Sequence, residues 1–99
     1  MPAYKAPLRD IRFLMNEVFD YPAHYKTLSI GENADADTVD MILEGAADFC
    51  ENVLSPLNQS GDEEGCHFKD GEVTTPKGFK EAYNQFIQGG WQGLSYPEE

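Results

Sequence analysis

The stretch DADTVDMILEGAADFCENVLSPLNQSG (35–61) decides the fold of this chain. Its apolar residues recur at i, i+3, i+4 and i+7, the spacing of an amphipathic helix. Asp35 or Asp37 can cap the N-terminus, where a carboxylate also suits the positive end of the helix dipole. The pattern therefore predicts a long helix over about 36–60, with a kink at Pro56 because proline lacks a backbone donor.

Shorter helical segments are expected before the long helix. Apolar residues spaced from Leu8 onward predict a helix near 8–20. It should stop before Pro22, since the residue preceding a proline avoids helical geometry. A weaker helical turn is expected from Pro22 to Leu28, and 29–37 has the aperiodic composition of a linker.

After the long helix the pattern changes. Gly61 or Gly65 is expected to end the helix. The Asp70-Gly71 pair lies between short β-prone runs, which predicts a short hairpin or an extended loop with a tight turn over 66–75.

A last helix is expected over 76–89. Thr75 would be its N-cap and Pro76 its first helical residue. Gly89-Gly90 would end it.

These elements predict an all-α fold, a small domain of three to four helices with one short hairpin or extended loop. The long helix would pack against the two shorter ones. The expected core is Leu8, Ile11, Leu14, Met15, Val18, Ile42, Leu43, Ala46, Phe49, Cys50, Val53, Leu57, Phe79, Ala82, Tyr83 and Phe86.

Composition excludes several classes of protein. Of 99 residues, 7 are Lys or Arg and 18 are Asp or Glu, giving a net charge of -11. This charge argues against binding to nucleic acid or to an anionic membrane, since both require a clustered basic face. No apolar run approaches the roughly 20 residues of a membrane-spanning helix, and the first ten residues, MPAYKAPLRD, lack the apolar h-region of a signal peptide. The chain contains two cysteines, Cys50 and Cys66, which are too few for a disulfide framework. We therefore expect a cytoplasmic location.

Asp40, Glu44, Asp48 and Glu51 repeat along the face opposite the apolar stripe. We expect a solvated helix face. The alternative is that this face belongs to a stand-alone acidic helical interaction module that meets a basic partner.

No residue is nominated as catalytic, cofactor-binding or metal-binding. His24, Cys50, Cys66 and His67 could in principle hold zinc, but they lack the closely spaced ligand pairs of structural zinc sites. Cys50 is better explained as a small buried apolar residue. No phosphate-binding glycine loop occurs in the sequence.

Trp91, Leu94 and Tyr96 follow the last helix in a segment containing Gly and Pro. Covering three such side chains would contribute about 5–8 kcal/mol. We expect this aromatic tail to contact polypeptide that follows it in a longer chain. A rival expectation is that the chain pairs its exposed aromatic faces in a dimer.

Three segments together resemble the acyl-CoA dehydrogenase family. ADFCENVLSPLNQSGDEEG (47–65) resembles the N-terminal helix of that family, and TPKGFKEAYNQFIQGGWQGLSYPEE (75–99) resembles the following helix. Residues 1–34, with YKAPLRDIRFLMNEVF, are similar to the extension of a longer subfamily that includes dehydrogenases of a methylthio-propanoyl-CoA. The insertion CHFKDGEVTTP (66–76) is longer than many relatives carry there.

The resemblance implies an oxidoreductase of fatty acid metabolism, a flavoprotein that removes hydrogens from the α and β carbons of an acyl-CoA thioester with FAD as acceptor. Residues 1–34 would be a helical extension and 35–99 the N-terminal helical domain, ending before the β-domain. Partners would be the remaining domains of the same chain, a homo-oligomer and the acyl-CoA substrate. The family's catalytic Glu and flavin contacts lie beyond Glu99, so the 99-residue chain should be inactive alone and bind no FAD.

Overall fold

The computed structural model describes residues 3–96, and its central element is a rod of consecutive helical segments. These are α3 (Ala36–Phe49), the π-helical η2 (Cys50–Leu54) and α4 (Ser55–Glu64). The predicted long helix is confirmed, and it ends at Gly65, whose φ of 69° suits glycine. Of the two proposed caps, Asp35 serves: its carboxylate accepts a hydrogen bond from the Thr38 backbone N–H at 2.8 Å. That N–H lowers the pKa of the Asp35 carboxyl.

The kink expected at Pro56 takes the form of a π turn just before it. The Ser55 backbone N–H donates to the Cys50 carbonyl, five residues back. Because Pro56 has no backbone N–H, it cannot donate to the carbonyl four residues before it. This favours a local shift in the pattern of backbone hydrogen bonds of the helix. The extra residue rotates the following side chains around the axis by about 100°. Leu54 is consequently 42% exposed, whereas Leu57 is half-buried.

The N-terminal segment is helical as predicted, in three pieces. The structure resolves the 8–20 helix into an α-helical start and a π-helical end, and it places the weaker turn in α2. Asp20, at a φ of 49°, caps α2 by accepting a hydrogen bond from the Ala23 N–H at 3.4 Å. The pieces are α1 (Leu8–Arg12), η1 (Phe13–Val18) and α2 (Tyr21–Lys26).

The segment between the two long helical regions is a hairpin rather than an extended loop. Strands β1 (His67–Lys69) and β2 (Glu72–Thr74) pair antiparallel, with Phe68 opposite Val73. Asp70 and Gly71 both have positive φ, 53° and 81°, as a two-residue hairpin turn requires.

The expected start of the last helix is wrong. Helix α5 (Phe79–Gln88) begins three residues after Pro76, and Gly78, at a φ of 92°, precedes it in place of a Thr75 cap. The Phe79 N–H donates to the Pro76 carbonyl at 3.2 Å, so a turn closes there before the helix begins. The end at Gly89-Gly90 is confirmed, and a short 3-10 turn η3 (Trp91–Gly93) follows.

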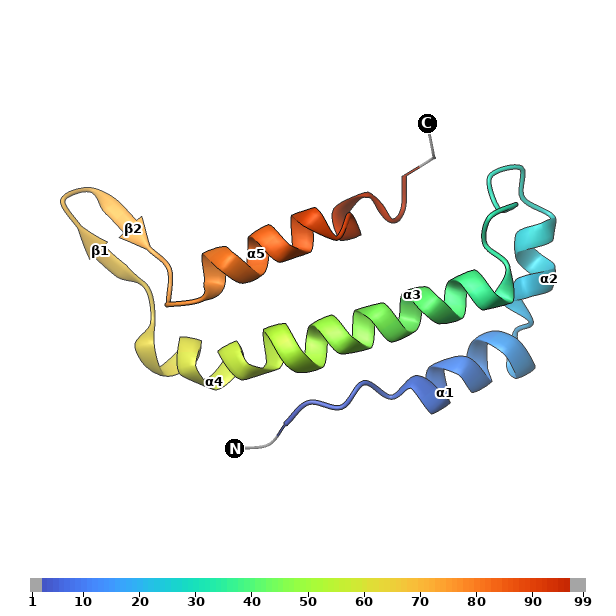
Figure 1. Ribbon diagram of the computed structural model, residues 1–99, viewed down its shortest axis with the longest axis horizontal. Helices are drawn as coiled ribbons and strands as arrows, with labels where there is room; N and C mark the ends of the chain where they lie inside the picture. Colours follow the sequence, from blue (N-terminus) through green and yellow to red (C-terminus); the bar gives the residue numbers. More distant parts are fainter. Residues whose placement is uncertain (1–2, 97–99) are drawn as a thin grey trace.

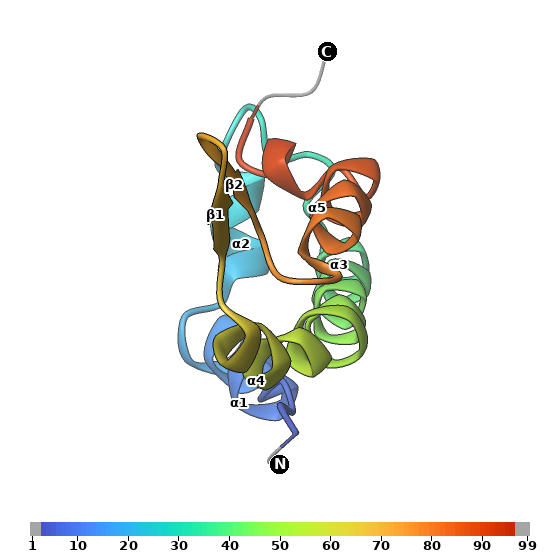
Figure 2. The same ribbon diagram turned by 90° about the vertical axis from the view of Figure 1, so that its left-hand side faces the viewer.

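The rod, α5 and residues 3–18 lie side by side in one layer (Figure 1, Figure 2). In Figure 1 the rod α3–η2–α4 runs through the centre, with α5 along one edge and residues 3–18 along the other, both antiparallel to it. Phe79 lies over Gly61, and Trp91 lies over Gly45 at the other end of α5. Seen along the long axis in Figure 2, the hairpin and α2 lie on one side, and α3 and α5 on the other.

A single layer of helices cannot enclose a core, because each helix has neighbours on two sides only. The shortest extent of the molecule is 16 Å, little more than one helix diameter. The radius of gyration is 17.5 Å, whereas a compact chain of this length has about 13 Å. Among the described residues the buried ones are Ala47, Gly61, Pro76 and Ala82.

The predicted core is therefore wrong except for Ala82. Eleven residues of the expected core are half-buried: Leu8, Ile11, Met15, Ile42, Leu43, Ala46, Phe49, Cys50, Val53, Leu57 and Phe86. The other four are exposed: Leu14, Val18, Phe79 and Tyr83. Periodicity identified the apolar faces, but their burial needs a second layer of polypeptide.

Within residues 3–96, no helix has the length and apolar character to cross a membrane.

Removal of the α3 cap should weaken the rod. Asp35→Ala leaves the Thr38 N–H without its acceptor and is expected to lower the thermal midpoint measured by far-ultraviolet circular dichroism. Asp37→Ala is the matched control, because it removes a first-turn carboxylate with no cap bond to Thr38. Equal losses in the two variants would mean that the dipole effect alone matters at this end.

Candidate interaction surface

The residues able to carry chemistry lie on separate elements. His24 lies beside Tyr25 on α2, with the two rings tilted by 50°. Cys50 is half-buried in η2, Cys66 is exposed between α4 and β1, and His67 begins β1. Across residues 3–96, no three His, Cys, Asp or Glu side chains come together in a metal-binding group. The four residues weighed for zinc are therefore not brought together.

The acidic face of the rod contacts the N-terminal segment of the same chain. The Arg12 guanidinium donates to Asp40 through Nε and to Glu44 Oε1 at 3.0 Å, and these carboxylates raise the Arg12 pKa. Glu51 lies 3.6 Å from the Lys5 ammonium. Asp48 accepts instead from Asn52, one turn further along its own helix. The face expected to be solvated is thus partly occupied by Lys5 and Arg12 of the same chain.

An apolar groove lies between the rod and α5. We call it the apolar groove; its volume is about 490 Å³. Aromatic rings form its floor, with the Phe49 and Phe86 centroids 6.3 Å apart and Tyr83 stacked at 6.4 Å from Phe86. Tyr83 is 64% exposed, so the groove is open to solvent. It is lined by Phe49, Leu54, Leu57, Asn58, Phe79, Ala82, Tyr83 and Phe86.

The aromatic tail is only partly covered. The Trp91 ring lies against α3, 3.6 Å from where a Cβ on Gly45 would stand, and it is half-buried. Leu94 and Tyr96 are 61% and 72% exposed. The tail therefore anchors α5 through one residue and presents the other two to solvent; residues 97–99 lie outside the described part.

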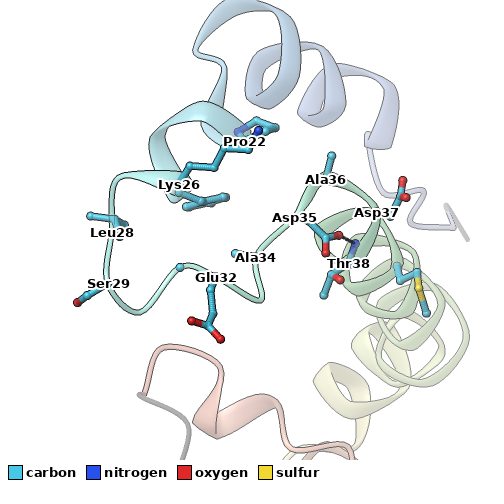
Figure 3. Close-up of a pocket in the computed structure, with 13 residues that line it drawn as sticks. Pro22, Lys26, Leu28, Ser29, Glu32, Ala34, Asp35, Ala36, Asp37 and Thr38 are labelled. Carbon is cyan, nitrogen blue, oxygen red and sulfur yellow. Dashed lines mark hydrogen bonds between the residues drawn. The ribbon is translucent and has the colours of Figure 1, made fainter.

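A second cavity, of about 860 Å³, lies where α2 and the following linker meet the start of α3 (Figure 3). The Asp35 carboxylate lies beside the cavity and accepts the hydrogen bond from the Thr38 N–H. Tyr25 is the aromatic residue that lines the cavity. The carboxylates of Glu32 and Asp37 make its rim acidic, and Lys26 is the basic residue lining it. The Asp35 carboxylate is therefore engaged as a helix cap at the edge of this cavity.

Glu64 closes the base of the hairpin. Its carboxylate accepts from the Lys77 backbone N–H at 3.1 Å and contacts His67 Nε2 at 3.1 Å. The Lys77 N–H, and after it His67, lower the pKa of the Glu64 carboxyl. This one side chain therefore ties the end of α4 to both ends of the hairpin segment.

Glu64→Gln is expected to lower the thermal midpoint at neutral pH, because the amide accepts more weakly from both donors. A lowered folded pKa means that the stabilisation is complete above the unfolded value, about 4.3, and is lost as the pH falls through the folded pKa. The difference between wild type and Glu64→Gln should therefore shrink below about pH 4. Glu63→Gln, which removes only a contact with Gln59 within α4, is the control. A difference that persists at low pH would contradict the assignment.

No family model matches the chain. Over 96 residues it is 38% identical to the 3-methylmercaptopropionyl-CoA dehydrogenase of Ruegeria pomeroyi, a match that covers 97% of this chain and 16% of the relative. Over 90 residues it is 32% identical to the butyryl-CoA dehydrogenase of Syntrophomonas wolfei, covering 88% of this chain and 15% of the relative. The chain belongs to the acyl-CoA dehydrogenase family.

The first relative is, by its name, a dehydrogenase of a sulfur-containing acyl-CoA. The chain spans about one sixth of the length of the acyl-CoA dehydrogenases it matches.

Proposed function

We propose that this chain is the N-terminal helical scaffold of an FAD-dependent acyl-CoA dehydrogenase, with residues 1–34 as an extension and 35–99 as the helical domain proper. The full enzyme would remove hydrogens from the α and β carbons of an acyl-CoA thioester in the cytoplasm, as a homo-oligomer. The open apolar groove is the observation that carries the proposal. Its exposed rings resemble one half of a domain core and require a covering layer.

The described residues do not fit a flavin by themselves. The cavity beside α2 has an acidic rim, which opposes the diphosphate of FAD. We therefore assign no residue to FAD and derive no step through it. The role proposed for the chain is packing and support, and the 99 residues alone should neither bind FAD nor oxidise acyl-CoA.

The test places a charge in the groove of the full-length enzyme. Tyr83→Asp should reduce both flavin retention and acyl-CoA-dependent reduction of an electron acceptor by about ten-fold or more, since the carboxylate would be buried under the covering domain. Asn84→Asp, an exposed residue outside the groove lining, is the matched control and should behave as wild type. In the isolated chain Tyr83→Asp should hardly change stability, because Tyr83 is already 64% exposed.

Equal behaviour of the two variants in the full enzyme would show that the groove is not a domain contact. A second test concerns the gene: its reading frame should continue beyond Glu99 into the larger part of a dehydrogenase. A stop codon directly after Glu99 would contradict the scaffold role.

A further inference from the structure

The N-terminal edge of the layer, residues 3–12, is held to the rod by polar contacts at both of its ends. We call these residues the strap. At one end the Tyr4 N–H donates to Ser55 Oγ at 3.2 Å and the Ala6 N–H donates to Glu51 Oε2 at 3.0 Å. At the other end Arg12 bridges two carboxylates of α3. From these contacts we propose that the strap is an electrostatic latch that opens and closes over a cavity beside Cys50.

Charge complementarity accounts for the position of the strap. Residues 5–12 contain Lys5, Arg9 and Arg12 against Asp10, a net charge of +2. Residues 36–54 carry no basic side chain and five acids, a net charge of -5. The strap is therefore a locally basic segment in an acidic chain, and it lies along the most acidic part of the rod.

Burial does not lock the strap in place. Leu8 and Ile11 are half-buried, and no residue of the strap is buried. The Lys5 side chain is 84% exposed and that of Arg12 is 34% exposed. Exposed ion pairs contribute little each and weaken with salt, so the strap is held by a set of individually weak contacts.

The strap covers a cavity of about 460 Å³ beside the π turn. Ala3 and Tyr4 of the strap form one wall, and Cys50 and Leu54 of η2 form the other. The polar contacts at Glu51 and Ser55 flank this cavity, so release of the strap removes its outer wall. An open strap leaves the Cys50 thiol accessible, and a closed strap shields it.

The test measures the rate at which N-ethylmaleimide modifies Cys50 in a Cys66→Ser background at neutral pH. In that background Arg12→Gln should raise the rate about five-fold, because two ion pairs are lost. Arg9→Gln is the matched control: it makes the same charge change within the same helix, whereas the contacts with Asp40 and Glu44 are made by Arg12. Glu51→Gln should also raise the rate, whereas Asp48→Asn, whose partner lies on its own helix, should not.

Salt provides an independent readout. Raising NaCl from about 0.1 M to about 1 M shortens the Debye length from about 10 Å to about 3 Å and should accelerate modification of Cys50. The control is a Cys50→Ser chain, in which N-ethylmaleimide modifies the exposed Cys66. The change of its rate with salt gives the effect of salt on the reaction of an exposed thiol. Arg12→Gln should respond to salt less than the wild type does, because both Arg12 ion pairs are lost while the Lys5–Glu51 pair is left. The proposal is overturned if Arg12→Gln and Arg9→Gln react at the same rate, or if the wild-type rate does not change with salt.

Discussion

Gly78→Ala is expected to destabilise the chain by about 2–4 kcal/mol. Gly78 has a φ of 92°, a conformation that costs an L-residue about 1–3 kcal/mol. A Cβ at this position would also stand 2.7 Å from a methyl carbon of Leu57, so the side chain of the rod must move. Because Gly78 immediately precedes α5, both penalties fall where the hairpin segment meets the rod.

Gly71→Ala separates the two penalties. Gly71 has a similar φ of 81° in the hairpin turn, but no atom lies within 4 Å of its Cβ position. It should therefore show the conformational cost alone, about 1–2 kcal/mol. Urea unfolding followed by circular dichroism measures both variants. Adding Leu57→Ala should remove the extra loss of Gly78→Ala; identical losses in Gly71→Ala and Gly78→Ala would show that the Leu57 contact is unimportant.

Gly61→Ala and Gly45→Ala are expected to change stability in opposite directions. Both glycines lie inside the rod, where alanine gains about 1 kcal/mol of helix propensity. At Gly45 a Cβ would meet the Trp91 ring at 3.6 Å, an ordinary contact, so Gly45→Ala should stabilise by about 0.5–1 kcal/mol. At Gly61 it would stand 2.5 Å from the Phe79 ring, so the ring must shift.

Displacing Phe79 should cost more than the propensity gained, leaving Gly61→Ala about 1 kcal/mol less stable than wild type. A double-mutant cycle isolates the contact. In a Phe79→Ala background Gly61→Ala should become stabilising, because the ring that it strikes is absent. Unfolding midpoints of the four chains give the coupling energy. Stabilisation by Gly61→Ala in the wild-type background would contradict the close approach of α4 and α5.

Local patterns of the sequence predicted the elements well. Helical spacing identified the rod, an Asp-Gly pair identified the hairpin turn, and paired glycines identified the end of α5. The start of α5 was missed, because Thr75-Pro76 has the composition of a helix start while the contact between Gly78 and Leu57 lies across the fold. No local signal reports such a contact.

For the acidic face and the apolar groove alike, the sequence showed which residues take part but not which distant residues they contact. Repeating carboxylates were visible in the sequence, but the pairing of Arg12 with Asp40 joins residues far apart in the chain. Likewise, Phe49 and Phe86 were both recognised as apolar, and only their approach to 6.3 Å makes them part of one groove.

By itself the sequence determined where helices and turns form, because spacing, capping and turn chemistry act within a few residues. It also carried the family resemblance, since that depends on the order of segments along the chain. The tertiary structure decided that these helices lie in one open layer, with the strap on an acidic edge and aromatic side chains uncovered. Such an arrangement depends on which apolar faces find a neighbour, and the faces left open here match the proposal of a partner domain.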